Sequence, residues 1–185
     1  MGSSCGRIVN YADDFVILSR GRAKEALRRT QEVTERLQVT LNAKKTSIKN
    51  ARHEPFDFLG YTFGPRYSPR TGRKYIGFGP SEKSVGKITG KVSELLDRGV
   101  VKPWEEVRDK LNETLKGWKQ YFDRGSTSGA YRAVDAHVEE RVRHFLRKRH
   151  KVSSQGTRQF SRERVYGVLG VFRLRTSACA EFVSL

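Results

Sequence analysis

The sequence predicts an α+β fold in which strands come first and helices follow. Residues 7–18, 56–63 and 74–78 are rich in the β-branched and aromatic residues typical of strands. From residue 80 onward, apolar residues recur at helical spacing in several long segments. The 185 residues, 36% of them hydrophobic, suffice for one domain or for two small modules that share a continuous core.

The first predicted element is a β-hairpin. Residues 7–11 and 15–18 form apolar and aromatic runs on either side of a short acidic break, which places Asp13 and Asp14 at the tip. A helix is predicted over residues 23–37, where apolar residues repeat at helical spacing and basic residues occupy the polar positions.

A second group of predicted strands follows this helix. A short strand is predicted over residues 39–41, and a polar loop over residues 43–46. Residues 56–63 alternate apolar and polar side chains and predict one continuous strand. Residues 74–78 predict its partner, and the turn-rich residues 68–73 form a long, basic hairpin tip between the two.

Pro80 and Ser81 begin a predicted helix with one apolar face. Lys83, Lys87 and Lys91 recur every four residues along this helix. Since residues four apart lie above one another on a helix, the three lysines are expected to form one exposed stripe.

The next helix begins at Pro103, and a last long helix spans residues 131–149. Trp104 and Trp118 share the apolar stripe of the first, which favours core packing over base stacking. Because Gly117 has no side chain, we expect another helix to pack closely against this position. The side chains expected to face inward from the last helix are Tyr131, Val134, Val138, Val142, Phe145 and Leu146.

The charge of the chain points to a polyanionic partner. Lysine and arginine total 37 against 20 acidic residues, a formal net charge of +17, which favours nucleic acid. No apolar run is long enough for a membrane span, and Cys5 and Cys179 show no metal-ligand spacing, so we expect a cytoplasmic protein with no membrane partner. The end of the last helix is strongly basic, which favours phosphate binding over a merely solvated face; the residues concerned are Arg141, Arg143, Arg147, Lys148 and Arg149.

Asp13 and Asp14 admit two interpretations. Adjacent carboxylates are common in ordinary polar turns. They also repel each other, by about 1 kcal/mol at about 4 Å in water and about 4 kcal/mol at an effective dielectric constant of about 20, and a bridging divalent cation removes this penalty. Nucleotidyl-transfer sites use such carboxylates to hold two metal ions. The preceding Tyr11 and Ala12 and the flanking apolar strands favour the metal site.

Four motifs occur in order along the chain. Residues 10–18 (Asn-Tyr-Ala-Asp-Asp-Phe-Val-Ile-Leu) and residues 41–46 (Leu-Asn-Ala-Lys-Lys-Thr) resemble the Tyr-Ala-Asp-Asp hairpin and the Leu-Asn-x-x-Lys-Thr element of the bacterial group II intron reverse transcriptases. Residues 56–61 (Phe-Asp-Phe-Leu-Gly-Tyr) resemble the Phe-Leu-Gly primer-grip strand. Residues 112–122 resemble the maturase signature Asn-x-x-Leu-x-Gly-Trp-x-x-Tyr-Phe.

This resemblance implies a role for each matching residue. Asp13, with Asp14 as its weaker neighbour, would be a catalytic ligand of Mg²⁺ in a polymerase site, and Tyr11 would lie near the primer end. The three residues Phe58, Leu59 and Gly60 would press on the primer strand, and Lys45 would lie near the nucleotide phosphates. The helix from Ser81 would belong to the thumb, and the later helices would grip structured intron RNA and assist its splicing.

The resemblance also implies what such a polymerase would need from elsewhere. Polymerases of this class carry a further Asp on an upstream strand, and fingers that hold the template. The chain begins six residues before the first hairpin strand, so we expect it to lack both and to be inactive in polymerisation alone. A partner chain would supply the fingers and the N-terminal palm, and Mg²⁺ would bind only in the completed site.

The resulting domain hypothesis has four parts. Residues 1–80 form the C-terminal part of a reverse-transcriptase palm, residues 81–101 a thumb-like helix, residues 102–176 a helical maturase-type RNA-binding domain, and residues 177–185 a tail. The leading functional hypothesis is a portion of an RNA-directed DNA polymerase that binds intron RNA and a DNA primer. The alternatives are an RNA-binding splicing maturase without polymerase activity and an unrelated basic DNA-binding module.

Overall fold

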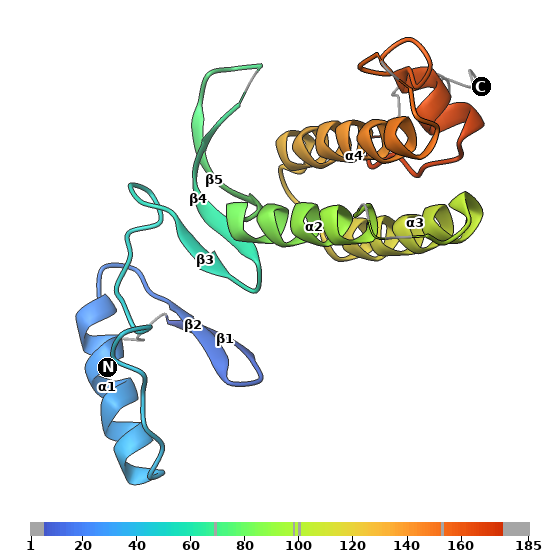
Figure 1. The fold of residues 1–185 in the computed structure, drawn as a ribbon. Coiled ribbons are helices and arrows are strands. Elements are labelled where there is room, and N and C mark those ends of the chain that lie inside the picture. The colour runs from blue at the N-terminus through green and yellow to red at the C-terminus, as the bar shows by residue number, and fades with distance from the viewer. Residues whose placement is uncertain (1–5, 69, 98, 100, 153, 176–185) are drawn as a thin grey trace, which may run out of the picture.

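The computed structural model describes residues 6–68, 70–97, 99, 101–152 and 154–175 and has the predicted α+β fold (Figure 1). Small antiparallel sheets come first, and a helical bundle follows. In chain order the elements are β1 (Arg7–Tyr11), β2 (Asp14–Leu18), α1 (Ala23–Arg36), β3 (Phe56–Phe58), β4 (Tyr61–Tyr67), β5 (Lys74–Pro80), α2 (Glu82–Leu95), α3 (Trp104–Tyr121), α4 (Ser128–Arg149) and the π-helix η1 (Arg164–Val168).

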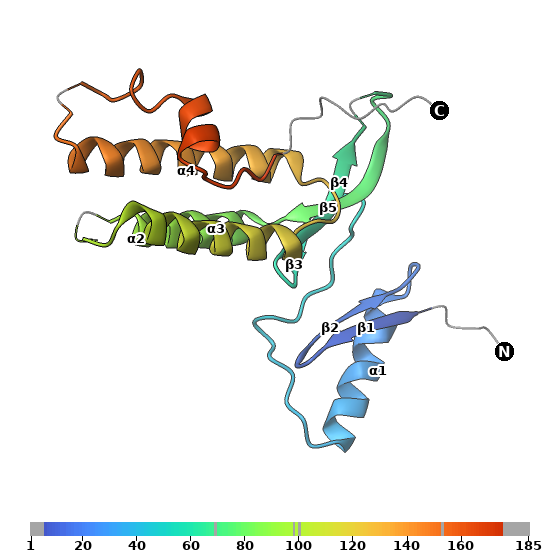
Figure 2. The same cartoon turned by 90° about the vertical axis from the view of Figure 1, so that its right-hand side faces the viewer.

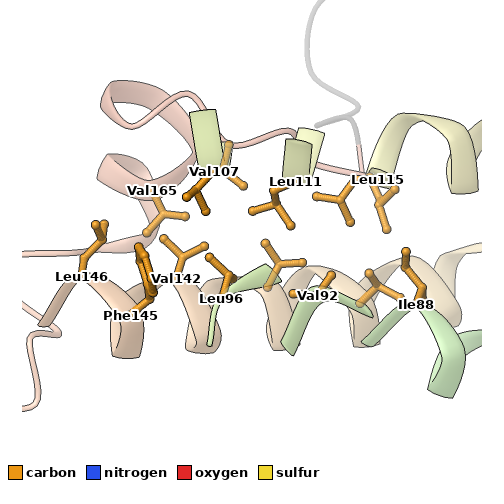
Figure 3. Close-up of a cluster of buried hydrophobic side chains, with 14 of the residues drawn as sticks. Ile88, Val92, Leu96, Val107, Leu111, Leu115, Val142, Phe145, Leu146 and Val165 are labelled. Atoms are coloured by element: carbon orange, nitrogen blue, oxygen red, sulfur yellow. The ribbon is translucent and has the colours of Figure 1, made fainter. Parts of the chain in front are cut away.

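The hydrophobic core lies between α2, α3 and α4, and η1 covers one end of it (Figure 3). Val92 of α2, Leu111 and Leu115 of α3, and Val138 of α4 are all 0% exposed. The predicted inward face of α4 is confirmed, because all six residues expected to face inward are buried. Each helix buries the apolar stripe that its sequence period predicts, so local pattern and packing agree.

The segment after η1 is fastened to the bundle by two side chains that reach its backbone. Asn112 of α3 donates to the carbonyl of Gly170 at 2.8 Å and accepts from the N–H of Phe172 at 2.7 Å. Asp135 of α4, 2% exposed, accepts from the N–H groups of Leu174 at 2.9 Å and Arg175 at 3.1 Å. These bonds satisfy backbone groups that no helix or sheet pairs.

The three-stranded sheet, in the order β3-β4-β5, corrects one prediction. Residues 56–63 are not one strand, because a tight turn at Leu59 (φ 50°) and Gly60 (φ 78°) separates β3 from β4. The second hairpin is confirmed: β4 pairs with β5 from Tyr61 opposite Pro80 to Tyr67 opposite Lys74, so residues 68–73 form its tip.

The turn that separates β3 from β4 is anchored to the bundle. The N–H of Ser81 and the hydroxyl of Ser84 both donate to the carbonyl of Gly60, at 2.9 and 2.8 Å. Tyr61 donates its hydroxyl to the carbonyl of Tyr121 at 2.6 Å, and Tyr121 donates its own to the carbonyl of Leu59 at 3.0 Å. The reciprocal tyrosine bonds fix the turn against the end of α3.

The first hairpin and α1 form a small unit away from the bundle (Figures 1 and 2). No described residue from 6 to 54 is buried. The predicted strand over residues 39–41 is wrong, because this segment has no neighbouring strand and Val39 is 57% exposed. A strand needs a partner for its backbone hydrogen bonds, and a three-residue segment with strand-forming side chains does not supply one.

Candidate nucleic-acid interface

A basic cleft of about 420 Å³ lies between α2 and α3. The Ser81 hydroxyl caps α2 by accepting from the N–H of Ser84 at 3.2 Å. This start directs Ile88 into the core and leaves Lys83, Lys87 and Lys91 exposed, as predicted. The residues that line the cleft are Lys87, Ile88, Lys91, Lys110, Glu113, Thr114, Gly117 and Trp118.

The electrostatics of this cleft favour an anion. Its one acidic lining residue, Glu113, accepts from the Lys110 ammonium at 2.7 Å, and this bond, with a smaller contribution from the charge of Lys91, lowers the Glu113 pKa. Within the described part of the chain, no salt bridge involves Lys87 or Lys91. Their ammonium groups therefore remain available to an anionic ligand.

Gly117 and Trp118 shape the α3 side of the cleft. The expected close helix approach at Gly117 is wrong, because a Cβ there would meet nothing within 4 Å. Trp118 packs on Phe122, with ring centroids 4.9 Å apart, so packing within the fold accounts for its ring, as predicted. The missing side chain at Gly117 leaves this wall open rather than bringing two helices together.

The basic residues near the end of α4 differ in their exposure and in the groups they contact. Arg141 donates to the carbonyls of Ser93 and Leu96 at 3.3 and 3.4 Å, where a cation suits the C-terminal end of α2. Arg143 pairs with Glu139 at 2.6 Å, and its side chain is only 22% exposed. Both arginines thus hold the fold together, and their predicted contact with RNA stays a prediction.

The remaining basic residues lie farther along the same helix. Arg147 is half-buried beside Gly156, whereas Lys148 and Arg149 are exposed. Arg149 donates to the carbonyl of Lys102 at 2.7 Å, which ties the end of α4 to the loop before α3. Of the predicted α4 cations, Lys148 and Arg149 are the most accessible to a polyanion.

Asp13 and Asp14 occupy the predicted hairpin tip. Tyr11 pairs with Asp14, Ala12 has a φ of 48°, and all four residues of the Tyr-Ala-Asp-Asp motif are exposed. Two carboxylates offer the oxygen ligands that Mg²⁺ prefers, so the donor chemistry fits this ion. No group of three or more His, Cys, Asp or Glu side chains suited to a metal occurs among the described residues.

The other predicted polymerase residues lie in two separate places. Lys45 belongs to a turn in which its N–H donates to the carbonyl of Asn42 at 3.0 Å. Phe58, Leu59 and Gly60 form the turn that is fixed against the bundle. Among the described residues, β1, β2 and α1 contact one another but make no extensive contact with the sheet or bundle. The structure therefore does not assemble these residues into one site.

Sequence reasoning missed the structural roles of Asn112, Tyr121 and Asp135. Asn112 and Tyr121 belong to the motif at residues 112–122, and they bind backbone groups of the C-terminal segment and of the β3–β4 turn. Spacing within the motif gave no signal of partners about 60 residues away, because those bonds depend on the tertiary fold.

A comparison with known families finds a match within the helical bundle. Residues 85–165 match the family described as group II intron, maturase-specific domain. The matched segment contains most of α2, all of α3 and α4 and the first residues of η1, and therefore the whole lining of the basic cleft. The match supports an intron-maturase role. A comparison with curated proteins found no match. None of the helices in the described residues is long and apolar enough to cross a membrane.

Proposed function

We propose that this chain, whose residues 85–165 match a maturase-specific domain, binds group II intron RNA through the cleft between α2 and α3. One observation carries the proposal: three exposed lysines run along α2 beside a cleft whose acidic residue is already paired with Lys110. Successive lysines of the stripe are about 6 Å apart along the helix axis, so a single strand of sugar-phosphate backbone can follow them.

The affinity for RNA is measured against salt concentration to test this proposal. Each phosphate contact releases counterions and adds about 0.7 to 0.9 to the slope of log affinity against log salt. Replacing Lys83, Lys87 and Lys91 with Gln is expected to reduce the slope by about 2 to 3. Lys24→Gln, which removes one such charge from α1, is expected to leave the slope nearly unchanged. Equal slopes for the triple variant and the unmutated chain would refute the cleft as the RNA site.

We propose further that the chain is the C-terminal portion of an RNA-directed DNA polymerase. The ordered motifs support this assignment, with residues 1–80 as part of the palm, residues 81–101 as a thumb-like helix and residues 102–176 as the RNA-binding domain. Asp13 and Asp14 would hold Mg²⁺, which polarises phosphate oxygens and lowers the pKa of an attacking hydroxyl when bound. Tyr11 and the turn around Leu59 would position the primer, with Lys45 near the nucleotide phosphates.

Complementation tests this finer proposal. The chain is mixed with the N-terminal half of a group II intron reverse transcriptase, and extension of an annealed DNA primer is measured with Mg²⁺. The unmutated chain is expected to support extension, and Asp13→Ala to abolish it, because the carboxylate is a proposed metal ligand. Arg20→Ala, at an exposed position outside the hairpin strands, is the control.

A second candidate function is an RNA-binding splicing maturase without polymerase activity. The exposure of both aspartates and the separation of their hairpin from the bundle favour it. Equal primer extension by the unmutated chain and Asp13→Ala would refute the catalytic role of this residue. No extension by either, together with retained RNA binding, would support the second candidate.

A further inference from the structure

A second cleft, of about 590 Å³, lies at the opposite end of the bundle from the β3–β4 turn. It is bounded by the start of α3, the end of α4 and part of residues 159–169. Pockets of about 300 to 1,000 Å³ commonly hold small molecules or single groups of a larger ligand. Neither the family match nor the lysine stripe of α2 assigns this cleft a ligand.

Three of the residues that line this cleft carry aromatic rings: Trp104, His150 and Phe160. Trp104 packs against Phe145 of the core, with ring centroids 6.3 Å apart, and His150 packs against Phe160 at 6.1 Å. The indole N–H of Trp104 is buried and has no hydrogen-bond partner among the described residues. An unsatisfied buried donor is destabilising, and Trp104 carries this donor in the lining of the cleft.

The polar part of the lining also includes two arginines, the Gln159 amide and one exposed carboxylate, Glu105. The Arg149 guanidinium is held in place by the carbonyl of Lys102 at 2.7 Å and by the Phe145 ring at 5.8 Å, and it keeps further N–H groups for a ligand. Arg164 and Gln159 are exposed. A partly aromatic cleft with a fixed guanidinium at Arg149 and an exposed one at Arg164 combines the features that proteins use to stack an unpaired base and to bind its phosphate.

We infer that this cleft takes one unpaired nucleotide of the bound RNA. The base enters between the aromatic walls, and Arg149 and Arg164 bind the adjoining phosphates. A base inside a duplex is stacked and paired and cannot enter such a cleft, so the cleft selects bulged or looped nucleotides. This inference rests on the proposed function. It gives the C-terminal end of α4 a role in binding a base, distinct from the contact that the α2 lysines make with the sugar-phosphate backbone of the RNA.

The test compares two RNA hairpins of equal length, one fully paired and one with a single-nucleotide bulge. Stacking one base on aromatic side chains is worth about 1 to 3 kcal/mol, so the unmutated chain is expected to bind the bulged RNA about tenfold more tightly. Arg164→Gln and Gln159→Ala, both at exposed positions, are expected to reduce this preference severalfold. Arg158→Gln removes the same charge from an exposed residue outside the lining and should keep the preference.

The outcomes separate this inference from the proposal on which it rests. Equal affinity of the unmutated chain for both hairpins would overturn the nucleotide site and leave RNA binding intact. Absence of binding to either would overturn the proposed function itself. Lys87→Gln is expected to weaken both complexes by the same factor. A photoreactive uridine at the bulge should cross-link to peptides that contain Trp104 or Phe160, and cross-linking to α2 alone would refute the placement.

Discussion

Gly60→Ala tests whether the β3–β4 turn depends on its contact with the bundle. Gly60 has a φ of 78°, and a Cβ at this position would lie 3.0 Å from the Ser84 hydroxyl and 3.1 Å from the Phe122 ring. Gly72, in the tip between β4 and β5, has a similar φ of 64° but nothing within 4 Å of a Cβ. Gly72→Ala is therefore a matched control for backbone strain without crowding.

The expected magnitudes follow from this comparison. An alanine in the left-handed region costs about 1 to 2 kcal/mol, and both variants bear this cost. Overpacking a filled site adds about 1 to 3 kcal/mol, which only the Gly60 variant bears. The Gly60→Ala chain is thus expected to lose about 2 to 5 kcal/mol of unfolding free energy, against about 1 to 2 for Gly72→Ala.

Urea unfolding followed by tryptophan fluorescence measures this difference. Trp118 packs on Phe122, one of the two side chains that would meet the new methyl group, so its emission reports on the affected region. The free energies are obtained by linear extrapolation to water. Equal destabilisation by Gly60→Ala and Gly72→Ala would refute the tight contact between this turn and the bundle.

Three further predictions concern the bundle. Asp135→Asn weakens the hydrogen bonds to the N–H groups of Leu174 and Arg175. It should lower the unfolding free energy by about 2 to 3 kcal/mol and speed hydrogen exchange at the Leu174 amide, and unchanged exchange would contradict this. Leu115→Ala opens a cavity at a position that is 0% exposed and should cost about 2 to 5 kcal/mol in urea unfolding, whereas a loss below about 1 kcal/mol would contradict the packing. Burial raises the pKa of Tyr131, so the folded chain holds the phenol proton more tightly than the unfolded chain. The free energy of unfolding should therefore be constant below the usual tyrosine pKa of about 10 and fall as pH rises above it. A urea midpoint that is unchanged at about pH 11 would contradict this.

The helices of the bundle could be predicted because their signal is local. The repeat of Tyr131, Val134, Val138 and Val142 marks one face of a helix, and each helix in the bundle buries the face that its own sequence makes apolar. The starts of α2 and α3 followed from Ser81 and Pro103, which begin helices for local steric and hydrogen-bonding reasons.

The features that could not be predicted depend on distant partners. Apolar residues continue from Phe58 through Leu59 to Tyr61 across the turn, and Gly60 was the only local sign of the break. Asp135 resembles an ordinary polar helix residue until the backbone of residues 174–175, about 40 positions later, folds against it. The basic run of α4 similarly gave no indication that Arg141 and Arg143 would turn towards internal partners.

Lysine footprinting tests the central claim most directly. The chain is acetylated with and without group II intron RNA, and modification at each lysine is quantified by mass spectrometry. The account predicts that Lys83, Lys87 and Lys91 are protected by RNA, whereas Lys24, which is exposed on α1, is modified equally in both samples. Strong protection of Lys24 with none along the α2 stripe would contradict the placement of RNA in the α2–α3 cleft.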